Sequence, residues 1–465
     1  MRHRSNGRKL RRAAVGKTTG LGNTITPLLA AALDATYRKV SWRLLPFLML
    51  LWILAWIDRV NIGFARLQML DALHLSEAAY GLGAGIFFIG YFLFEVPSNL
   101  LLAKIGAKRT IARITIAWGI TSVGMMFVRS AGAFYVLRFL LGVFEAGFYP
   151  GIILYLTYWY PPARRARAFG LFMSASALAG VIGGPLAGLI LTRLDGANGW
   201  MGWQWVFLLE GIPSILAGLA TLAWLVDRPA QARWLTAAEQ TLLREDHARA
   251  APPAHDGSRG ALAGLTDRRV WLCIAIFFGI VTANSALTFW GPALVRELGI
   301  ALPTTIGWIM AGAYLCGGAG MILNGAHSDR AGEVRYHCAV AALASAVCIA
   351  LLGLVLPHHK LAALLLLTAA ITGTMSAIPV FWQLPARLLS GAAAAAGIAL
   401  INAVANLAGF VAPAAIGAVR GMTGRLSDGL LGVAACEALA VALILLYIPR
   451  VPAIRNAQPI RRRRP

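Results

Sequence analysis

The stretch LLPFLMLLWILAWIDRVNIGFA (44–65) decides the fold class of this chain. It is apolar over roughly the 20 residues that a helix needs to cross the hydrocarbon of a bilayer, yet it holds an adjacent acid and base. A second such stretch, FYVLRFLLGVFEAGFYPGIILYL (134–156), holds an arginine and a glutamate. A charge at mid-bilayer costs about 2.5–3.5 kcal/mol on insertion scales. We therefore expect the four charged side chains to face a wet central cavity and one another. They are Asp58, Arg59, Arg138 and Glu145.

Composition supports a membrane protein. Of the 465 residues, 58% are hydrophobic and 13% are charged, whereas soluble domains carry about 25% charged residues. A backbone in lipid must satisfy its own hydrogen bonds, which for runs this long means helices. The sequence therefore predicts an all-α membrane protein with twelve transmembrane helices in two six-helix bundles. The expected spans are 44–66, 80–102, 111–129, 134–157, 167–192, 204–226, 270–291, 304–326, 337–356, 361–383, 391–419 and 429–448.

The net charge of +23 raises the question of nucleic acid, but its distribution argues against that partner. With both termini placed in the cytoplasm, 33 of the 42 Lys and Arg residues fall in the tails and loops of that side. Such a bias is what the positive-inside rule predicts. The charge therefore sets membrane topology, and the expected surrounding partner is the lipid bilayer.

The predicted domain organisation has five parts. A polar linker, 227–269, separates an N-terminal bundle, 41–226, from a C-terminal bundle, 270–449. The basic tails, 1–40 and 450–465, are expected to be cytoplasmic and disordered. The alternative is that these tails contact anionic lipid, where each basic residue contributes about 1 kcal/mol.

An internal repeat relates the two bundles. NLLLAKIGAKR between spans two and three aligns with GAHSDRAGEVR between spans eight and nine, so that Lys104 falls on Arg330 and Gly106 on Gly332. Parallel repeats of six helices are one architecture for alternating access.

At these residues a family resemblance emerges. The loop 325–335 resembles the loop motif of the major facilitator superfamily. The likeness to the anion:cation symporters of that superfamily runs from about Tyr37 to Arg450. It is carried by DRVNIGFA (58–65), FEVPSN (94–99), RFLLGVFEAGFYPG (138–151), YWYPPARRARA (158–168), WVFLLEGIP (205–213) and FWQLPARLLSGAAAAAGIALINAVANLAGFVAP (381–413). The resemblance implies a bacterial inner-membrane transporter of sugar acids, tartrate-like acids or aromatic acids. It also implies that the four buried charges bind protons and the substrate anion, with Tyr91 near the substrate.

The repeated loops are expected to form a cytoplasmic gate. A charge pair at a helix end can bond to a neighbouring helix and hold that face shut. The gate residues are Lys104, Arg109, Asp329 and Arg330, and the expected carboxylate partner for Lys104 or Arg109 is Glu95 or Glu210.

Spacing suggests a division of roles among the buried charges. Arg138 and Glu145 lie seven residues apart, on one helical face about 10.5 Å apart along the axis, while Asp58 and Asn61 share a face on the other helix. We expect Glu145 and Asp58 to take up protons, Arg59 to bind the substrate carboxylate, and Arg138 to bind the anion and to hold ionised Glu145. The alternative is a static ion-pair network that supports the fold.

The C-terminal bundle offers neutral polar and aromatic side chains in place of charges. Asn402 and Asn406 share a helical face and can bond hydroxyl groups or, alternatively, join helices. Trp56 stands where galactonate transporters resemble one another in having tyrosine, which leaves the substrate open. The expected substrate contacts are Trp56, Asn61, Asn284, Trp290, Trp382, Gln383, Asn402 and Asn406.

These features predict a secondary transporter that imports a small organic anion by proton symport. The alternative is a proton-coupled efflux antiporter for drugs or sugars. The expected oligomeric state is a monomer. The glycine-rich stretch GVIGGPLAG (180–188) resembles an antiporter motif but also suits close helix packing. An enzyme is not expected, because no nucleophile, metal set or nucleotide loop is apparent. The proton is the expected coupling ion, without a cofactor or metal.

Overall fold

The computed structural model describes residues 27–250, 266–356, 358–389 and 392–449. Within these ranges twelve helices are long and apolar enough to cross a membrane, which confirms the predicted all-α membrane fold. We call the first six spans the N half: α2 (Pro27–Ala72), α3 (Glu77–Ile105), α4 (Ala107–Gly124), α5 (Ala131–Glu145) with α6 (Phe148–Trp159), α7 (Pro162–Arg193) and α8 (Gly202–Trp224). The C half holds α11 (Arg268–Glu297), α12 (Pro303–Ala331), α13 (Arg335–Val355), α14 (Lys360–Phe381) with α15 (Gln383–Leu388), α16 (Ala392–Ala405) with α17 (Ala408–Thr423), and α18 (Leu426–Tyr447).

The fourth span is broken in its middle, between α5 and α6. Gly147 has a φ of +82°, a left-handed conformation that glycine adopts without strain. A Cβ atom there would lie 2.6 Å from the Ser98 hydroxyl oxygen of α3. The break makes Glu145 the last residue of α5, so that its side chain sits at an interruption inside the membrane.

The first helix is longer than expected. We predicted that 27–40 belongs to a disordered tail, and this was wrong, because α2 begins at Pro27 and runs for 46 residues. Proline is favoured in the first helical turn, and the Ala- and Leu-rich residues that follow have high helix propensity. Residues 1–26 and 450–465 lie outside the described residues, so the rest of the expectation for the tails stays a prediction.

The start of α2 packs on a helix of the linker, α9 (Ala237–Ala250). Lys39 Nζ lies 2.8 Å from Glu239 Oε2, and the Tyr37 hydroxyl donates to Asp246 at 2.8 Å. Thr236 and Glu239 exchange the two bonds of a capping box, which starts α9. The hydrogen bond from Lys39 is the main cause that lowers the pKa of Glu239 below its ordinary value.

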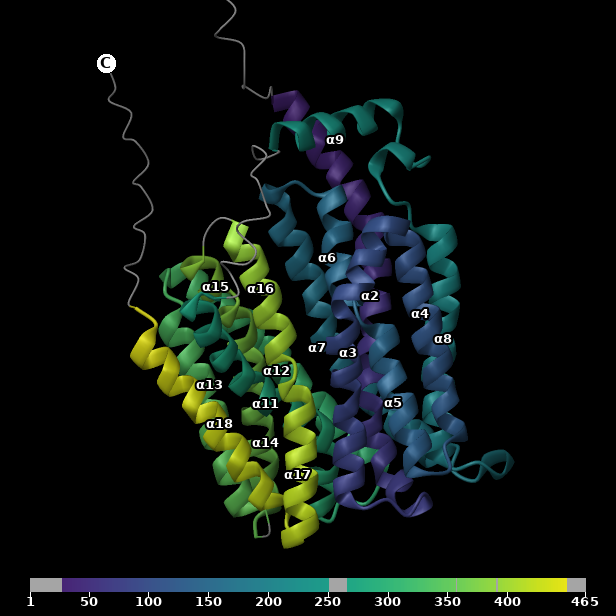
Figure 1. Cartoon of the computed structure of the whole chain (residues 1–465), viewed down its shortest axis with the longest axis vertical. Helices are drawn as coiled ribbons and strands as arrows, with labels where there is room; N and C mark the ends of the chain where they lie inside the picture. The colour runs from purple at the N-terminus through teal and green to yellow at the C-terminus, as the bar shows by residue number, and fades with distance from the viewer. Residues whose placement is uncertain (1–26, 251–265, 357, 390–391, 450–465) are drawn as a thin grey trace, which may run out of the picture.

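The two halves lie side by side in Figure 1, with the purple-to-blue N half beside the green-to-yellow C half. We call the end that carries α9 and the start of α2 the terminal end. The opposite end, where α2 passes into α3, we call the closed end, because the halves touch closely there. A Cβ atom on Gly184 of α7 would lie 2.7 Å from the Gly307 carbonyl oxygen of α12. One turn further, Thr304 Oγ1 donates to Thr192 Oγ1 at 2.8 Å.

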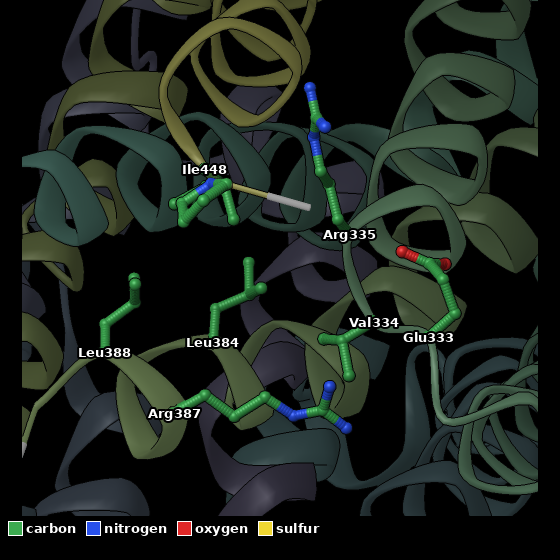
Figure 2. A pocket seen from close by; sticks show the side chains of 8 residues that line it. Glu333, Val334, Arg335, Leu384, Arg387, Leu388 and Ile448 are labelled. Atoms are coloured by element: carbon green, nitrogen blue, oxygen red, sulfur yellow. The ribbon is translucent and has the colours of Figure 1, made fainter. Parts of the chain in front are cut away.

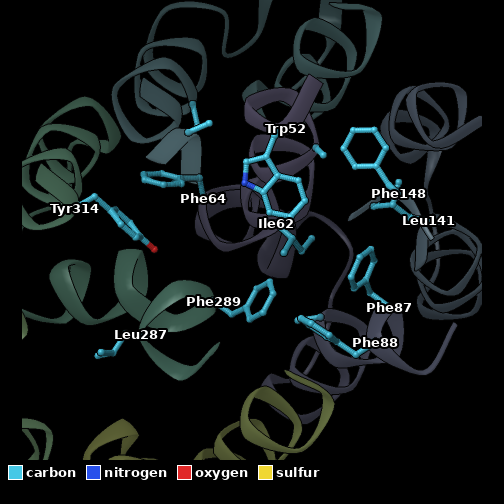
Figure 3. Close-up of a cluster of buried hydrophobic side chains, with 14 of the residues drawn as sticks. Trp52, Ile62, Phe64, Phe87, Phe88, Leu141, Phe148, Leu287, Phe289 and Tyr314 are labelled. Carbon is cyan, nitrogen blue, oxygen red and sulfur yellow. The ribbon is translucent and has the colours of Figure 1, made fainter. Parts of the chain in front are cut away.

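A buried aromatic cluster continues this contact toward the middle of the molecule (Figure 3). Phe88 of α3 packs edge-on against Phe289 of α11 with ring centroids 6.0 Å apart. Tyr80 of α3 donates its hydroxyl to the Phe289 carbonyl oxygen at 3.0 Å. Since these contacts join α3 to α11, they hold the N half and the C half together at the closed end.

Candidate functional site

An ion pair between Arg59 and Glu145 forms the centre of the candidate site. Arg59 of α2 donates from Nε to Glu145 Oε1 of α5 at 3.1 Å, and its Nη2 atom bonds the same oxygen. The Glu145 side chain is 1% exposed and the Arg59 side chain 13% exposed. Breaking a buried ion pair costs about 3–5 kcal/mol, because the remaining charge loses its partner. Loss of either partner is therefore expected to be costly.

Four aromatic rings surround the Arg59 guanidinium. Its central carbon lies 5.2 Å from the ring centroid of Phe87, 5.5 Å from those of Trp56 and Tyr91, and 6.0 Å from that of Trp52. A cation over an aromatic face gains roughly 0.5–2 kcal/mol according to its solvation. Trp56 and Tyr91 thus lie beside the arginine that the sequence singled out for the anion. The aromatic cage also orients the guanidinium.

Arg138 takes a different place from the one we predicted. It is fully buried and donates to two backbone carbonyls of α3, from Nε to Gly83 at 3.3 Å and from Nη2 to Ala84 at 3.1 Å. The expectation that it holds Glu145 was wrong, since that carboxylate is bonded by Arg59. A shared helical face is not contact: two turns separate the side chains by about 10.5 Å along the axis.

Asp58 points away from Arg59, into the interior of the N half. Its carboxylate accepts from the Ser122 hydroxyl at 2.7 Å, the Ser214 hydroxyl at 2.6 Å and the Trp118 indole nitrogen at 3.1 Å. These donors belong to α4 and α8. The prediction that Asp58 lines the central cavity was wrong, because successive residues are rotated by about 100° around a helix. Asp58 and Arg59 therefore face separate compartments.

Asn61 and Glu210 lie in the same interior compartment. Both are buried, and the Glu210 carboxylate of α8 interacts with Asn61 and with Asp58. Asn61 was expected to contact substrate and Glu210 to pair with the gate. The interactions of Glu210 with Asp58 and Asn61 stay within the N half and do not involve the gate residues.

Across from the cage, the C half contributes the two predicted asparagines. Asn402 Nδ2 of α16 donates to Glu95 Oε1 of α3 at 3.3 Å, which is a hydrogen bond between the halves. Asn406 Nδ2 donates to the Asn402 backbone oxygen at 2.8 Å and to its side-chain oxygen at 3.1 Å. The shared helical face is thus observed, and one member of it bonds the opposite half.

Glu95 is the residue that sequence reasoning assigned to the wrong site. It was considered as a partner for the gate, whereas it is 8% exposed, bonds Asn402 and interacts electrostatically with Tyr91. Tyr91 and Glu95 are four residues apart on α3, so they share a face. That spacing, together with an acid inside an apolar span, was the available signal.

The remaining C-half candidates lie elsewhere. Trp290 lies at the closed end, where its ring packs edge-on against Tyr80 at 5.3 Å. Trp382 packs edge-on against Phe277 of α11 at 4.9 Å, and Gln383 donates to Asp329 Oδ1 at 3.0 Å. Asn284 is half-buried within α11. Large polar or aromatic residues in a span are therefore a weak guide to substrate contact, because most of them serve packing.

A small pocket next to the cage lies between α2, α7, α11 and α12. It is lined by Val60, Phe64, Ala179, Gly180, Gly184, Thr288, Met310 and Tyr314. The Tyr314 hydroxyl donates to the Thr288 hydroxyl oxygen at 3.2 Å. Its lining comes from both halves, so this pocket lies at the interface between them.

The predicted gate residues lie at the terminal end and are exposed: Lys104, Arg109, Asp329 and Arg330. The bond of Asp329 to Gln383 stays within the C half. In the N half the corresponding loop is held by Asp227, which accepts from the Lys108 backbone nitrogen at 2.8 Å. Within the described ranges, none of the four makes a hydrogen bond or ion pair to the other half.

At the closed end, an ion chain that the sequence analysis did not foresee joins four helices. Arg66 of α2 pairs with Glu77 of α3. Arg420 of α17 pairs with Glu77 at 3.1 Å and with Glu297 of α11 at 2.8 Å. Trp290 lies between the two cations, 4.8 Å from the Arg66 guanidinium and 6.0 Å from that of Arg420. The chain crosses between the N half and the C half at the pair of Glu77 and Arg420.

Two six-helix halves, closed against each other at one end around a buried charged site, define a membrane transporter of the alternating-access class. A family model described as Major Facilitator Superfamily matches residues 48–413. The chain belongs to the major facilitator superfamily, and its relatives place it in the anion:cation symporter branch, which confirms the predicted family. Its relatives are transporters and its fold is that of a transporter family, so the chain is not an enzyme.

Three relatives illustrate the range of the branch. The chain is 44% identical to the "Putative metabolite transport protein NicT" of Pseudomonas putida, over 88% of this chain and 94% of that protein. It is 42% identical to a "Putative tartrate transporter" of Agrobacterium vitis, over 89% and 92%. It is 39% identical to a "Quinolone resistance transporter" of Acinetobacter baumannii, over 88% and 94%.

Solved structures share the fold. A bacterial homologue of the human lysosomal transporter Spinster, in an inward-facing and unoccupied conformation, matches with a TM-score of 0.72 and 17% identity, over 91% of this chain and 97% of that one.

Proposed function

We propose that this transporter imports an organic carboxylate together with protons by alternating access. The observation that carries the proposal is the ion pair of Arg59 and Glu145 inside an aromatic cage. A site of this kind offers one cation that can bind an anion and one acid that can release that cation. The similarity to a protein named for tartrate supports a carboxylate as the anion.

Proton uptake and anion binding are linked through the shared arginine. When Glu145 takes up a proton its charge is lost, and the Arg59 guanidinium is left without a partner. A buried unpaired arginine is unfavourable, so a substrate carboxylate replaces Glu145 as its partner. Guanidinium suits this exchange because it bonds carboxylates in a bidentate manner. On release, Glu145 loses the proton and pairs with Arg59 again.

Asp58 is proposed as a second proton-binding group, separate from the anion. Its three hydrogen-bond donors stabilise the carboxylate. Because Asp58 and Arg59 are adjacent in α2, a movement of this helix shifts both side chains. Arg138, which we expected to bind the anion, is instead proposed to hold α5 on α3 through its two carbonyl bonds.

The C half is proposed to recognise the uncharged part of the substrate. Asn402 and Asn406 present amide groups opposite the cage, and amides both donate to and accept from hydroxyl groups. Trp56 and Tyr91 provide flat surfaces beside the carboxylate site. A hydroxy acid or an aromatic acid of small size fits this combination.

The proposed location is a bacterial inner membrane with both termini in the cytoplasm, where the basic loops favour them. The closed end then faces outward, and the structure is an inward-facing state. The proposed unit of transport is the monomer, because the site is assembled from the two halves of one chain.

Efflux is a second candidate, favoured by the relative named for quinolone resistance. In an exporter, the pair of Arg59 and Glu145 would bind a proton from outside as the drug is released there. Direction separates the two: expression of an importer allows growth on its substrate, whereas expression of an exporter raises the tolerated concentration of a drug.

The test uses purified protein in proteoliposomes with tartrate, galactonate or phthalate. We expect Glu145→Gln to retain exchange of labelled for unlabelled substrate but to lose accumulation driven by an imposed pH gradient. We expect Arg59→Lys to raise KM at least tenfold, because lysine cannot form the bidentate pair. Glu245→Gln, the same change at an exposed position of α9, is the matched control. Accumulation by Glu145→Gln under the pH gradient would contradict the proposal.

A further inference from the structure

A second pocket lies at the terminal end of the C half, away from the candidate site (Figure 2). The start of α13, the short helix α15 and the end of α18 surround it. It is lined by Glu333, Val334, Arg335, Leu384, Arg387, Leu388, Ile448 and Pro449. None of these residues takes part in the transport cycle proposed above.

Two arginines lie on opposite sides of this pocket, with Leu384 and Val334 between them in Figure 2. Arg335 donates from Nε to the Ile444 carbonyl oxygen at 3.3 Å and from Nη2 to that of Leu445. Arg387 donates from Nη1 to the Gly332 carbonyl oxygen at 3.2 Å. Each guanidinium carries five N–H groups, so both keep donors for an anion while the carbonyls fix their positions.

A third arginine adjoins the pocket and strengthens its positive charge. Arg269 at the start of α11 donates to the carbonyl oxygen of Leu388 at 3.2 Å, and Leu388 is part of the lining. Arginines from three helices thus line or adjoin one pocket.

The one carboxylate in the lining is already engaged. Glu333 accepts from the backbone nitrogen of Tyr336 at 2.8 Å and from Nδ1 of His337 at 2.8 Å. Partial burial acts to raise the pKa of Glu333, but these hydrogen bonds outweigh it and hold the pKa below its ordinary value. The charge of Glu333 is therefore compensated by donors in the first turn of α13. This compensation weakens the repulsion between Glu333 and an anion bound at the two arginines.

The rest of the lining is apolar, which suits a lipid better than a free ion. Leu384 and Ile448 are buried in the floor. The start of α13 and the end of α18, which border the pocket, expose large apolar side chains: Val340 is 63% exposed, and Leu446 is 74% exposed. In a chain that crosses a bilayer, such exposed side chains on spanning helices contact acyl chains.

We propose that this pocket binds the phosphate headgroup of an anionic phospholipid. The phosphodiester bonds free N–H groups of the arginines that line the pocket, since guanidinium can bond phosphate oxygens in pairs, and the acyl chains follow the outer surface of α13 and α18. Basic pockets between transmembrane helices on the cytoplasmic side are the setting in which such headgroups are recognised. A bound lipid would join α13, α15 and α18 within the C half.

The test is native mass spectrometry of the full chain, released from detergent with phosphatidylglycerol or with phosphatidylcholine. We expect the wild type to retain phosphatidylglycerol preferentially, and we expect R335Q/R387Q to bind one fewer of these lipids or to bind it at least tenfold more weakly. R233Q/R244Q is the matched control, because both arginines are exposed residues of the linker at the same end and the charge removed is equal. It should bind like the wild type.

Further variants keep the proposal falsifiable if the double variant does not fold. Arg387 is exposed, so R387Q alone should fold and weaken binding, and L388E should abolish it by placing a carboxylate in the pocket. Equal loss of phosphatidylglycerol in R233Q/R244Q would overturn the proposal, since binding would then follow net charge alone. Complete displacement of the lipid by inorganic phosphate would also overturn it, because the ligand would be a soluble anion.

Discussion

The closed end and the terminal end of the interface between the halves use charge in opposite ways. At the closed end, Arg66, Glu77, Arg420 and Glu297 form one chain of ion pairs that passes between the halves. At the terminal end, Asp329 bonds Gln383 within its own half. The same kinds of residue thus join the halves at one end and only shape a loop at the other.

The difference indicates that contacts at the closed end stabilise the present conformation. Backbone also approaches backbone at the closed end, as at Gly184 and Gly307. Opening of the closed end would break these contacts, and new contacts at the terminal end would have to offset their loss. The exposed gate residues are available for that purpose, since their charges are not paired across the interface here.

The largest effect is expected from Gly307→Val at the closed end. A Cβ atom at this position would press into the Gly184 backbone, and overpacking of this kind costs about 1–3 kcal/mol. Transport should fall at least tenfold, and the closed end should separate. The measurement is the distance between spin labels on His74→Cys and Met422→Cys, with exposed Cys316 replaced by serine.

Gly312→Val, at a position of α12 where a side chain meets open space, is the control for this first prediction. An unchanged label distance in Gly307→Val would mean that the glycine contact does not hold the halves together.

A smaller effect is expected from Glu77→Gln. The change removes the carboxylate shared by Arg66 and Arg420, which then repel each other. The expected loss is larger than for an exposed pair and smaller than for a fully buried one, roughly 1–2 kcal/mol in favour of the state in which the closed end is open. The same label pair should report a larger population with a long distance. Asp71→Asn, an exposed acid at the same end, should leave the distribution as it is.

At the terminal end, Asp329→Asn should change the conformation far less. Its bond to Gln383 lies within one half, and asparagine can still accept it, so the expected cost is under about 1 kcal/mol. We expect slower uptake with an unaltered label distance at the closed end. A distance change as large as that of Glu77→Gln would show that the terminal end already holds the halves.

The smallest effect is expected from Lys39→Ala, which removes the contact of α2 with Glu239 in α9. Because Lys39 lowers the pKa of Glu239, the pair stabilises the fold above the ordinary pKa of glutamate, and this contribution is lost as the pH falls through the lowered pKa. For such an exposed pair it amounts to less than about 1 kcal/mol.

The measurement for Lys39→Ala is hydrogen exchange of the α9 amides, relative to the isolated peptide. A difference between the variant and the wild type at pH 7 should disappear at acidic pH. A difference that persists unchanged in acid would show that Lys39 acts through packing.

The sequence was sufficient to locate the spans and the level in the membrane at which the charged site lies. A charged side chain in an apolar span is costly in lipid and must therefore face the interior of the protein. The sequence was not sufficient to orient side chains. Asp58 and Arg59 are neighbours in the chain, yet they face different compartments, and only the packing of α4 and α8 against α2 decides which one meets the C half. For the same reason the sequence assigned Glu145 to Arg138, whereas in the structure Arg59 bonds this carboxylate.

The ion chain at the closed end escaped prediction for a different reason. Arg66, Glu77, Glu297 and Arg420 stand at span ends, where charges are ordinary and usually solvated. Their pairing depends on contacts between helices distant in sequence, such as α3 with α17, and no spacing along the chain reveals these contacts.

The position of Trp290 gives the closed end an optical reporter of its own. Its indole is fully buried between two guanidiniums and the edge of a tyrosine. Opening of the closed end would draw these neighbours apart and admit water around the ring. In a variant that keeps Trp290 and replaces the other tryptophans, the fluorescence emission should shift to longer wavelength each time the carrier turns outward, so that turnover can be followed without an attached dye.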